Sequence, residues 1–598
     1  MSVLSFVRVP QRAHSQVKHA AARLREYLTS LGKVPDRAIV EVKIRKRSVP
    51  QAGDEGYAIR SSARNKITIA ANTDAGAANG MYGLMMASRT RQMKNPFAET
   101  WDLMETPRWS QRRMAVASFL IGLTKMTPDM WTFEDWKQYI DFVRQFNINY
   151  LSILSPYMYH PDVPETYQNQ WRFDVFRQVI AYAHEHGMKV SLMNCYNQAP
   201  ARAFWEHPEW RAVGLRAYFG QFLCWSKAKR EIMKYQKAII DYLDGLDGFE
   251  LIVAEPTGWC LCDQCSSDMG AVFVDAVKEV RRAFRRKNPD GQIIFWNWFL
   301  GFIAGWQGVL PIPPGPVKDI ARIQPKVFRE MPDDVIFLDL SMNQMRNMAA
   351  WPGVADRPGQ IESLKVAAEG YGRPTINLMF MMDVENGMVD RLSIFPRPFL
   401  DAIIDEFEYT KALPVMGVSG YRLAPPGRFL CDFFYMRKSW NPDLTREQLV
   451  DEAAAFLTSN AKQKRTIAGA IENIERYWHK RRRKDLIAAR DAFQEVGARC
   501  ASSELRRIRD GLTILAMVDD YARAVKKVDD ACKTVKGMGR LTGAREKRFQ
   551  AVFEAMKQYP IYQGFTSEGF WESRAKEFLL RPNMRMWADY INMREYYY

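Results

Sequence analysis

The 598-residue sequence lacks any run of about 18 uncharged apolar residues, so we expect no transmembrane helix. Its first residues, MSVLSFVRVPQRAHSQ, have neither the basic start and apolar stretch nor the small-residue cleavage site of a secretory signal. We therefore expect a cytoplasmic protein, although a secreted chain trimmed of its leader would begin in the same way. Tandem repeats and low-complexity linkers are also absent, which predicts folded units that pack closely together.

Cysteine and histidine are scarce, with 8 Cys and 7 His in the whole chain. Clustered cysteines in this number exclude a disulfide framework. Nucleophilic triads find little support, because most of the histidines fall in predicted helices or turns. Only His160, which follows a predicted strand, is placed to contact a ligand, and a surface histidine is the simpler interpretation.

Positive charge is in excess, since 85 Lys and Arg against 68 Asp and Glu give a net charge of +17. Such a charge permits an anionic partner. We expect neither nucleic acid nor membrane binding, because the densest basic run, HKRRRK at 479–484, falls in a predicted helix and no nucleic-acid motif accompanies it. A uronic or sulfated sugar stays open as a ligand.

Three domains are expected from the pattern along the chain. Residues 1–108 predict a small α+β domain, with strands at 6–10, 38–45, 57–60 and 66–70 and a helix at 15–31. Residues 429–598 predict a helical domain that ends in an aromatic tail.

Between these domains, residues 109–428 predict a (β/α)8 barrel, in which short apolar runs alternate with amphipathic helices. An open doubly wound sheet is less consistent with the pattern, because no Gly-x-Gly-x-x-Gly turn follows the first strand. The eight predicted strands are Met114–Ser118, Asn149–Leu154, Lys189–Asn194, Phe249–Ala254, Gln292–Asn297, Val335–Leu340, Thr375–Met382 and Val415–Ser419.

Carboxylates and aromatic residues follow several of these strands, at the end of the barrel where such folds hold their reactive groups. Sugar hydrolysis needs one carboxylic acid to protonate the leaving oxygen and a second group to stabilise or attack the cationic carbon. We predict Glu255 as the acid, with Asp383 and Glu385 as candidates for the second group. The candidate substrate-binding residues are Tyr157, Tyr159, His160, Asn197, Trp259, Trp296, Asn297, Trp298, Asp339 and Tyr421.

Three thiols follow Glu255 closely, in the pattern Cys260-x-Cys262-x-x-Cys265. Their spacing predicts a tetrahedral structural zinc site, which needs a fourth ligand. We choose Cys224 as that ligand, with Cys195 as the second choice. Reduced structural thiols are the alternative, and no cofactor is expected for catalysis itself.

The segment from Gly56 to Gly83 contains Tyr-x-Ile, Ile-x-Ile and Gly-x-x-x-Gly-x-Tyr-Gly, followed later by PRWSQRR. In these motifs it resembles the α+β domain that precedes the barrel in family 20 β-hexosaminidases and family 67 α-glucuronidases. The resemblance implies an exo-acting glycoside hydrolase whose acid follows the fourth barrel strand, which here is Glu255. Family 20 enzymes carry an adjacent Asp-Glu pair, whereas this chain has Ala254 before Glu255.

Three hypotheses remain open for an oligosaccharide or glycoconjugate partner. The first is a retaining, substrate-assisted exo-β-N-acetylhexosaminidase, acting on an N-acetylglucosaminide or N-acetylgalactosaminide, in which Asp383 or Glu385 polarises the acetamido group. The second is an inverting exo-glycosidase on a uronic or other acidic sugar, resembling an α-glucuronidase. The third is a non-catalytic barrel that binds glycans on Trp296 and Trp298. The sequence leaves a homo-oligomer open.

Overall fold

The structure is a computed structural model that describes most of the chain. The described residues are 6–32, 35, 38–63, 65–116, 131–154, 167–198, 203, 206–213, 222–253, 260–297, 314–341, 343–344, 362–380, 396–422, 429–497 and 503–532, with short pieces between 543 and 551. Among the helices in these ranges, none combines the length and apolar character that crossing a membrane requires.

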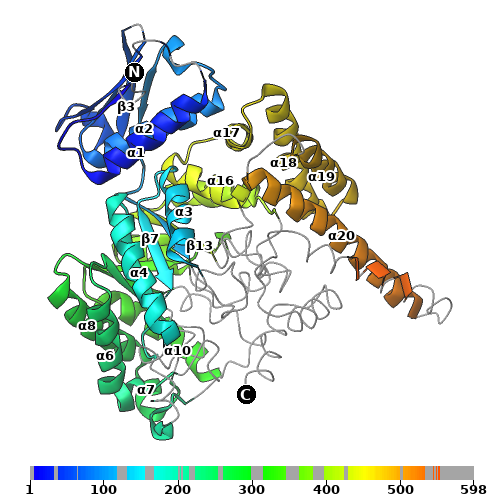
Figure 1. Ribbon diagram of the computed structural model, residues 1–598. Helices are drawn as coiled ribbons and strands as arrows, with labels where there is room; N and C mark the ends of the chain where they lie inside the picture. The colour runs from blue at the N-terminus through cyan, green and yellow to red at the C-terminus, as the bar shows by residue number, and fades with distance from the viewer. Residues whose placement is uncertain are drawn as a thin grey trace.

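A five-stranded mixed sheet forms the N-terminal part of the chain, drawn in blue in Figure 1. Its strand order is β1-β2-β4-β3-β5, in which β3 runs antiparallel to both β4 and β5. The four predicted strands are confirmed. The prediction missed β5, because this strand has only two apolar residues, which lie between Asp102 and Glu105. The elements are β1 (Val7–Arg8), α1 (Ser15–Ser30), β2 (Ile39–Ile44), β3 (Tyr57–Ala63), β4 (Lys66–Ala71), α2 (Asp74–Thr90) and β5 (Asp102–Glu105).

Glycines allow α2 to lie directly on this sheet. A Cβ atom at Gly80 would lie 2.6 Å from Cγ2 of Ile69, and one at Gly83 would lie 1.9 Å from the hydroxyl of Tyr57. Both distances are far inside van der Waals contact, so a larger residue would push the helix off the strands. The glycine pattern of this segment therefore follows from close helix–sheet packing.

The middle of the chain forms a closed barrel of eight parallel strands, which confirms the predicted fold class. Consecutive strands pair from β6 to β13, and β13 pairs with β6 to close the ring. The first and last strands differ most from the prediction: the first begins at Gln111 rather than Met114, and the last covers Gly417–Arg422 rather than Val415–Ser419. The strands are β6 (Gln111–Val116), β7 (Tyr150–Leu154), β8 (Lys189–Cys195), β9 (Gly248–Ile252), β10 (Gln292–Trp296), β11 (Val335–Asp339), β12 (Thr375–Phe380) and β13 (Gly417–Arg422).

Helices surround the barrel, and a further group of helices follows it (Figure 1). Those between the strands are α3 (Phe133–Arg144), α4 (Tyr167–Glu185), α6 (Trp225–Tyr242), α7 (Asp263–Ser267), α8 (Met269–Lys287), α10 (Pro314–Glu330), α13 (Ser363–Lys365) and α15 (Leu400–Lys411). The C-terminal helices are α16 (Phe429–Trp440), α17 (Arg446–Leu457), α18 (Ala461–Lys480), α19 (Arg483–Gly497) and α20 (Ser503–Cys532).

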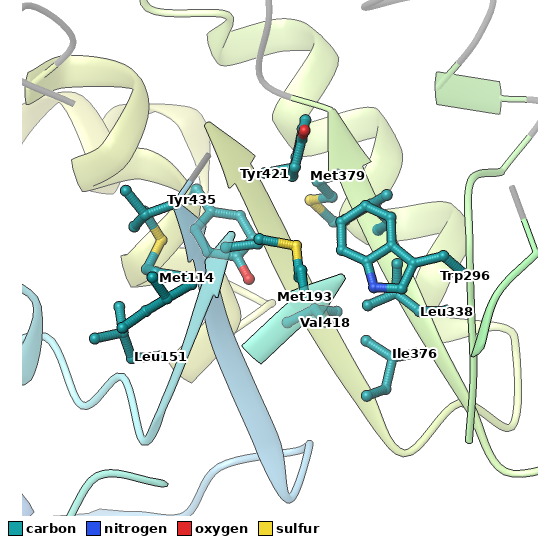
Figure 2. Packing of buried hydrophobic residues seen from close by; sticks show 14 of the residues in the cluster. Met114, Leu151, Met193, Trp296, Leu338, Ile376, Met379, Val418, Tyr421 and Tyr435 are labelled. Atoms are coloured by element: carbon teal, nitrogen blue, oxygen red, sulfur yellow. The ribbon is translucent and has the colours of Figure 1, made fainter. Parts of the chain in front are cut away.

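One large apolar core joins the barrel to the C-terminal helices. Figure 2 shows buried side chains of the barrel strands, such as Met114, Leu151 and Val418, packed together with Tyr435 of α16. The Tyr435 hydroxyl donates a hydrogen bond of 2.8 Å to the backbone oxygen of Arg113 in β6. The first C-terminal helix is therefore part of the barrel's packing.

The N-terminal sheet is attached to the barrel by a buried arginine. The Arg112 side chain of β6 is fully buried and donates to both carboxylate oxygens of Glu55, at 2.8 and 2.9 Å. Its remaining donors reach the backbone oxygens of Asn147 at 2.9 Å and Trp109 at 2.7 Å. Although burial opposes it, the Arg112 guanidinium lowers the pKa of the Glu55 carboxyl.

Trp440 of α16 makes a second attachment to the same sheet. Its ring belongs to the apolar core of the N-terminal part and stacks 6.0 Å from the ring of Tyr57. The indole N–H donates to Glu105 of β5 at 2.7 Å, and the Tyr57 hydroxyl donates to the same carboxylate. The sheet therefore contacts both the barrel and the helices that follow it.

We predict that Arg112→Leu destabilises the protein by about 3 kcal/mol, because it leaves the Glu55 carboxylate without its ionic partner in a largely buried place. Chemical denaturation followed by tryptophan fluorescence would measure the loss. Arg60→Leu is the matched control, because Arg60 and Asp102 form an exposed pair at 3.6 Å, which should contribute about 1 kcal/mol or less. Equal effects of the two substitutions would contradict the attachment role of Arg112.

Candidate functional site

The carboxyl end of the barrel is where the sequence predicts the reactive groups. β9 ends at Ile252, and the buried Val253 follows it. The predicted acid Glu255 and the predicted second groups Asp383 and Glu385 lie outside the described residues. Five predicted substrate-binding residues also lie outside them, namely Tyr157, Tyr159, His160, Trp259 and Trp298. Their roles stay predictions.

Trp296, predicted as a substrate platform, is a buried residue of the barrel. It ends β10, pairs in register with Ile252 and Leu338, and is only 2% exposed. Its ring lies 5.4 Å from that of Tyr421, edge to face, and Figure 2 shows both rings among apolar side chains. The indole N–H donates a hydrogen bond of 2.6 Å to Glu250. The structure thus brings Trp296 and Tyr421 together in the packed interior.

Glu250 of β9 organises a polar network inside the barrel. Its carboxylate, fully buried, forms an ion pair with the equally buried Arg113 of β6. The hydroxyls of Ser152 and Ser191 also donate to it, the first at 2.7 Å. Since Trp296 donates to its other oxygen, Glu250 links five neighbouring strands, from β6 to β10.

Asp339 and Asn297 form a second buried network where β10 and β11 end. Asn297 donates to the Asp339 carboxylate at 2.8 Å, and the backbone N–H of Leu340 donates to its other oxygen, also at 2.8 Å. Burial raises the pKa of Asp339 to about 7, and the hydrogen bonds from Ser363 and Asn297 offset it only in part. The Oδ1 atom of Asn297 is buried with no hydrogen-bond partner among the described residues.

A third carboxyl, Glu406 of α15, is buried behind the ends of β11 and β12. It accepts hydrogen bonds from Ser341 and Asn377, both at 2.6 Å, and from Asn343 at 3.1 Å. Burial raises the pKa of Glu406 to about 7, against the effect of these hydrogen bonds. Ser341 and Asn343 follow β11, so Glu406 holds the start of that loop against β12.

Asn197, another predicted substrate-binding residue, is fully buried after β8. Its side-chain amide donates to the backbone oxygen of Leu223 at 3.1 Å, and the Leu223 N–H returns a bond of 3.0 Å to the backbone of Asn197. These bonds fix the segment that leads into Cys224. Asn197 therefore has a positioning role in the described structure, and its contact with substrate stays a prediction.

The four cysteines predicted to bind zinc lie together beside the end of β9. The sulfur atoms of Cys224, Cys260, Cys262 and Cys265 are all within 4.8 Å of one another. The Cys224 sulfur lies 3.6 Å from that of Cys262 and 3.7 Å from that of Cys265. The first-choice ligand Cys224 completes the group, and the second choice, Cys195, does not belong to it.

Donors surround this thiol cluster. The Val213 backbone N–H donates to the Cys260 sulfur at 3.4 Å, and the Ser226 hydroxyl lies 3.0 Å from the Cys224 sulfur. Hydrogen bonds from Cys260 and Cys265 lower the pKa of Cys224, while contact with Cys224 raises the pKa of the other two thiols. Four sulfur atoms this close together offer the soft ligands that a soft cation prefers.

Sequence analysis missed Glu250, Arg113 and Glu406. A signal for Glu250 exists, since it is a charged residue within the otherwise apolar strand β9, and such a residue in a buried strand must be paired. Arg113 follows Gln111 and Arg112, so it does not look like strand interior. Glu406 gave no such signal, because a glutamate in an amphipathic helix usually faces water.

Comparison with sequences alone finds no matching family model and no similar curated protein. Solved structures share the fold over most of the chain. A GH138 enzyme targeting pectin rhamnogalacturonan II aligns with a TM-score of 0.60 and 11% identity, over 92% of this chain and 74% of that one. A family GH115 4-O-methyl-α-glucuronidase with specificity for decorated arabinogalactans aligns with a TM-score of 0.57 and 10% identity, over 93% and 76%. CpGH84B aligns with a TM-score of 0.52 and 12% identity, over 93% and 94%.

We predict that Glu406→Gln flattens the dependence of stability on pH. The folded state raises the pKa of this carboxyl from about 4.5 to about 7, so the folded protein keeps the proton while the unfolded chain loses it. The wild type should therefore lose on the order of 2–3 kcal/mol of stability between pH 5 and pH 8, which the variant does not lose through this group. Unfolding free energies measured across this range would show the difference.

Glu408→Gln, on the same helix but half exposed, is the control and should keep the pH dependence of the wild type. Parallel curves for the wild type and Glu406→Gln would mean that the Glu406 carboxyl ionises normally in the folded protein.

Proposed function

We propose that this protein is an exo-acting glycoside hydrolase with Glu255 as its general acid. The observation that carries the proposal is the closed barrel of eight parallel strands, whose strand β9 ends three residues before Glu255 in the sequence. In such barrels the catalytic groups follow the carboxyl ends of the strands. The structural matches to a GH138 enzyme and a GH115 glucuronidase, which cover 92% and 93% of this chain, support the same class of reaction.

In this mechanism Glu255 protonates the oxygen of the leaving sugar, while Asp383 or Glu385 supplies the second carboxylate. An inverting enzyme separates its two carboxyl groups by about 6.5–9.5 Å to admit a water molecule, and a retaining enzyme by about 5–5.5 Å. The buried networks of Glu250, Asp339 and Glu406 hold the strand ends and loop starts that flank these groups. A rigid support of this kind keeps reacting groups in position without reorganisation during the reaction.

We propose a uronic sugar as the substrate class. The net charge of +17 suits an acidic sugar, and the GH115 neighbour is a 4-O-methyl-α-glucuronidase. Under this proposal the enzyme inverts configuration, with Glu255 as acid and Asp383 or Glu385 as base.

An N-acetylhexosaminide is the second candidate, and the glycine-containing motif of α2 supports it through the resemblance to family 20. In that case the 2-acetamido group of the substrate is the nucleophile and Asp383 or Glu385 polarises it. Ala254 counts against this candidate, because it stands where the resemblance expects an aspartate. A binding-only barrel has less support, because Trp296 is buried and its N–H is bonded to Glu250.

We also propose a structural zinc ion held by Cys224, Cys260, Cys262 and Cys265. Four thiolates around Zn²⁺ with bonds of about 2.3 Å lie about 3.8 Å apart, close to the sulfur distances of 3.6 and 3.7 Å at Cys224. A site filled by four thiolates leaves no open position for substrate, so the ion would stabilise the fold there. The ion would hold Cys260 in position, five residues after Glu255 in the sequence.

The test of the catalytic proposal is release of chromophore from aryl glycosides by the wild type and by Glu255→Gln. We expect turnover of a glucuronide and at least a hundredfold lower kcat/KM in the variant, because the amide cannot protonate the leaving oxygen. Glu209→Gln, at an exposed position after β8, is the control and should leave the rate unchanged. Turnover of an N-acetylglucosaminide or N-acetylgalactosaminide instead would favour the second candidate, and turnover unaffected by Glu255→Gln would remove Glu255 from the mechanism.

The test of the zinc proposal is the metal content of the purified protein. We expect about one zinc per chain in the wild type and in Cys195→Ser, and much less than one in Cys224→Ser, which removes a ligand. Removing zinc with a chelator should lower the thermal midpoint of the wild type. A wild-type zinc content well below one, with unchanged stability after chelation, would leave the four cysteines as reduced thiols.

A further inference from the structure

A cavity lies where the N-terminal part, the barrel and the C-terminal helices meet. It has a volume of about 480 Å³ and takes its walls from α1, α2, α3, α17 and the start of α20. A smaller cavity of about 220 Å³ shares four lining residues with it and extends it toward α4. The combined space has the size of a small-molecule site, and such sites favour domain junctions. Figure 1 shows α1 and α2 beside α3 and α17.

Two arginines line this junction cavity, and they differ in their partners. Arg23 of α1 is paired with Asp141 of α3 and, at 3.2 Å, with Glu26. Arg89 of α2 has no carboxylate partner within 4.0 Å among the described residues. Its guanidinium instead lies 4.9 Å from the ring centres of both Tyr27 and Phe456.

The Arg89 guanidinium belongs to a partly exposed side chain that lines the cavity, so a ligand bound there can reach its donors. It carries five N–H donors in a plane, and two aromatic faces satisfy none of them along their hydrogen-bonding directions. Cation–π contact with the two rings contributes about 0.5–2 kcal/mol and leaves these donors open to a ligand. Burial also lowers the pKa of Arg89. A carboxylate supplied from outside the chain would satisfy the planar donor set in two parallel hydrogen bonds.

The other charged groups of the cavity restrict what such a ligand can be. Glu26, Asp141 and Glu504 also line it, and they disfavour a dianion such as a phosphate ester. The oxygen atoms of these carboxylates can accept hydrogen bonds from a ligand, and so can the hydroxyl oxygens of Tyr27 and Tyr82. A ligand that fits therefore combines one negative group for Arg89 with hydroxyl or amino donors for these oxygens.

We propose that the junction cavity binds a small monocarboxylate that carries hydroxyl or amino groups, the class of sugar acids and amino acids. Its carboxylate pairs with Arg89, and its apolar face packs on Phe142 and Phe456. The bound molecule contacts all three parts of the chain, so binding strengthens their association. The proposal does not depend on the glycosidase activity.

The test is calorimetric titration of the full-length protein with sodium glucuronate and L-glutamine, with glucose as the uncharged match for glucuronate. We expect at least one of the two carboxylates to bind and glucose not to bind. Arg89→Met, which keeps the packing of the stem against both rings, should weaken that binding at least tenfold. Arg91→Gln, two residues along and over the ring of Trp101, should leave it unchanged.

Two results would overturn the proposal. One is the absence of binding by both carboxylates, and the other is binding that Arg89→Met leaves intact. Glucuronate could also bind in the catalytic pocket, so Glu255→Gln is titrated in parallel. Binding lost in Glu255→Gln but kept in Arg89→Met would assign the ligand to the barrel mouth, which would support the proposed glycosidase while refuting the junction site.

Discussion

Two adjacent arginines at the start of the first barrel strand are the constraint on which the assembly depends. Because side chains alternate along a strand, Arg112 points outward and Arg113 points into the barrel. Arg112 holds Glu55 of the N-terminal part, and Arg113 holds Glu250 across the barrel interior. A slip of one residue in β6 would put Gln111 or Met114 in the place of one of these arginines and leave one of the two carboxylates unpaired. The register of the barrel and the docking of the N-terminal sheet are therefore specified by the same dipeptide.

The polar groups around the barrel follow from this arrangement. Glu250 is satisfied by Arg113, two serines and Trp296, so the interior at that level is rigid and closed. Nearer the ends of the strands, Asp339 and Glu406 are buried and form no ion pair with any described residue, and burial raises the pKa of each to about 7. They accept hydrogen bonds from asparagines and serines on the neighbouring loops. The ion pair of Arg113 and Glu250 thus holds the barrel interior together. The weakly acidic carboxyls of Asp339 and Glu406 hold the starts of the loops, which are the parts that determine specificity in barrels of this kind.

The sequence was sufficient for the fold, because eight apolar runs separated by amphipathic helices are consistent with few other architectures. It also predicted Cys224 as the partner of a thiol group 36 residues away, because three cysteines in six residues leave a tetrahedral site one ligand short. It placed the start of β6 too late, since Arg112 and Arg113 do not look like strand interior until Glu55 and Glu250 are known. Trp296 was expected to face a ligand. It is instead the last paired residue of β10, points into the barrel, packs against Tyr421 and donates a hydrogen bond to Glu250. Contacts such as these, between residues far apart in the sequence, leave no periodic pattern in the sequence.

The described residues on either side of the segment that carries the proposed acid Glu255 are held by the barrel wall and by the cysteine cluster. On one side, the backbone oxygen of Ile252 accepts a hydrogen bond of 3.2 Å from Tyr196, which keeps the end of β9 attached to β8. On the other side, the Cys260 sulfur is held by the Val213 N–H and by the three neighbouring thiols. The ends of the connection are therefore fixed within a short distance in sequence, and each attachment comes from the chain after β8. A metal ion at the cysteines would strengthen one of these two attachments. Its influence on the proposed acid would then be exerted through the position of the backbone and not through contact with the substrate.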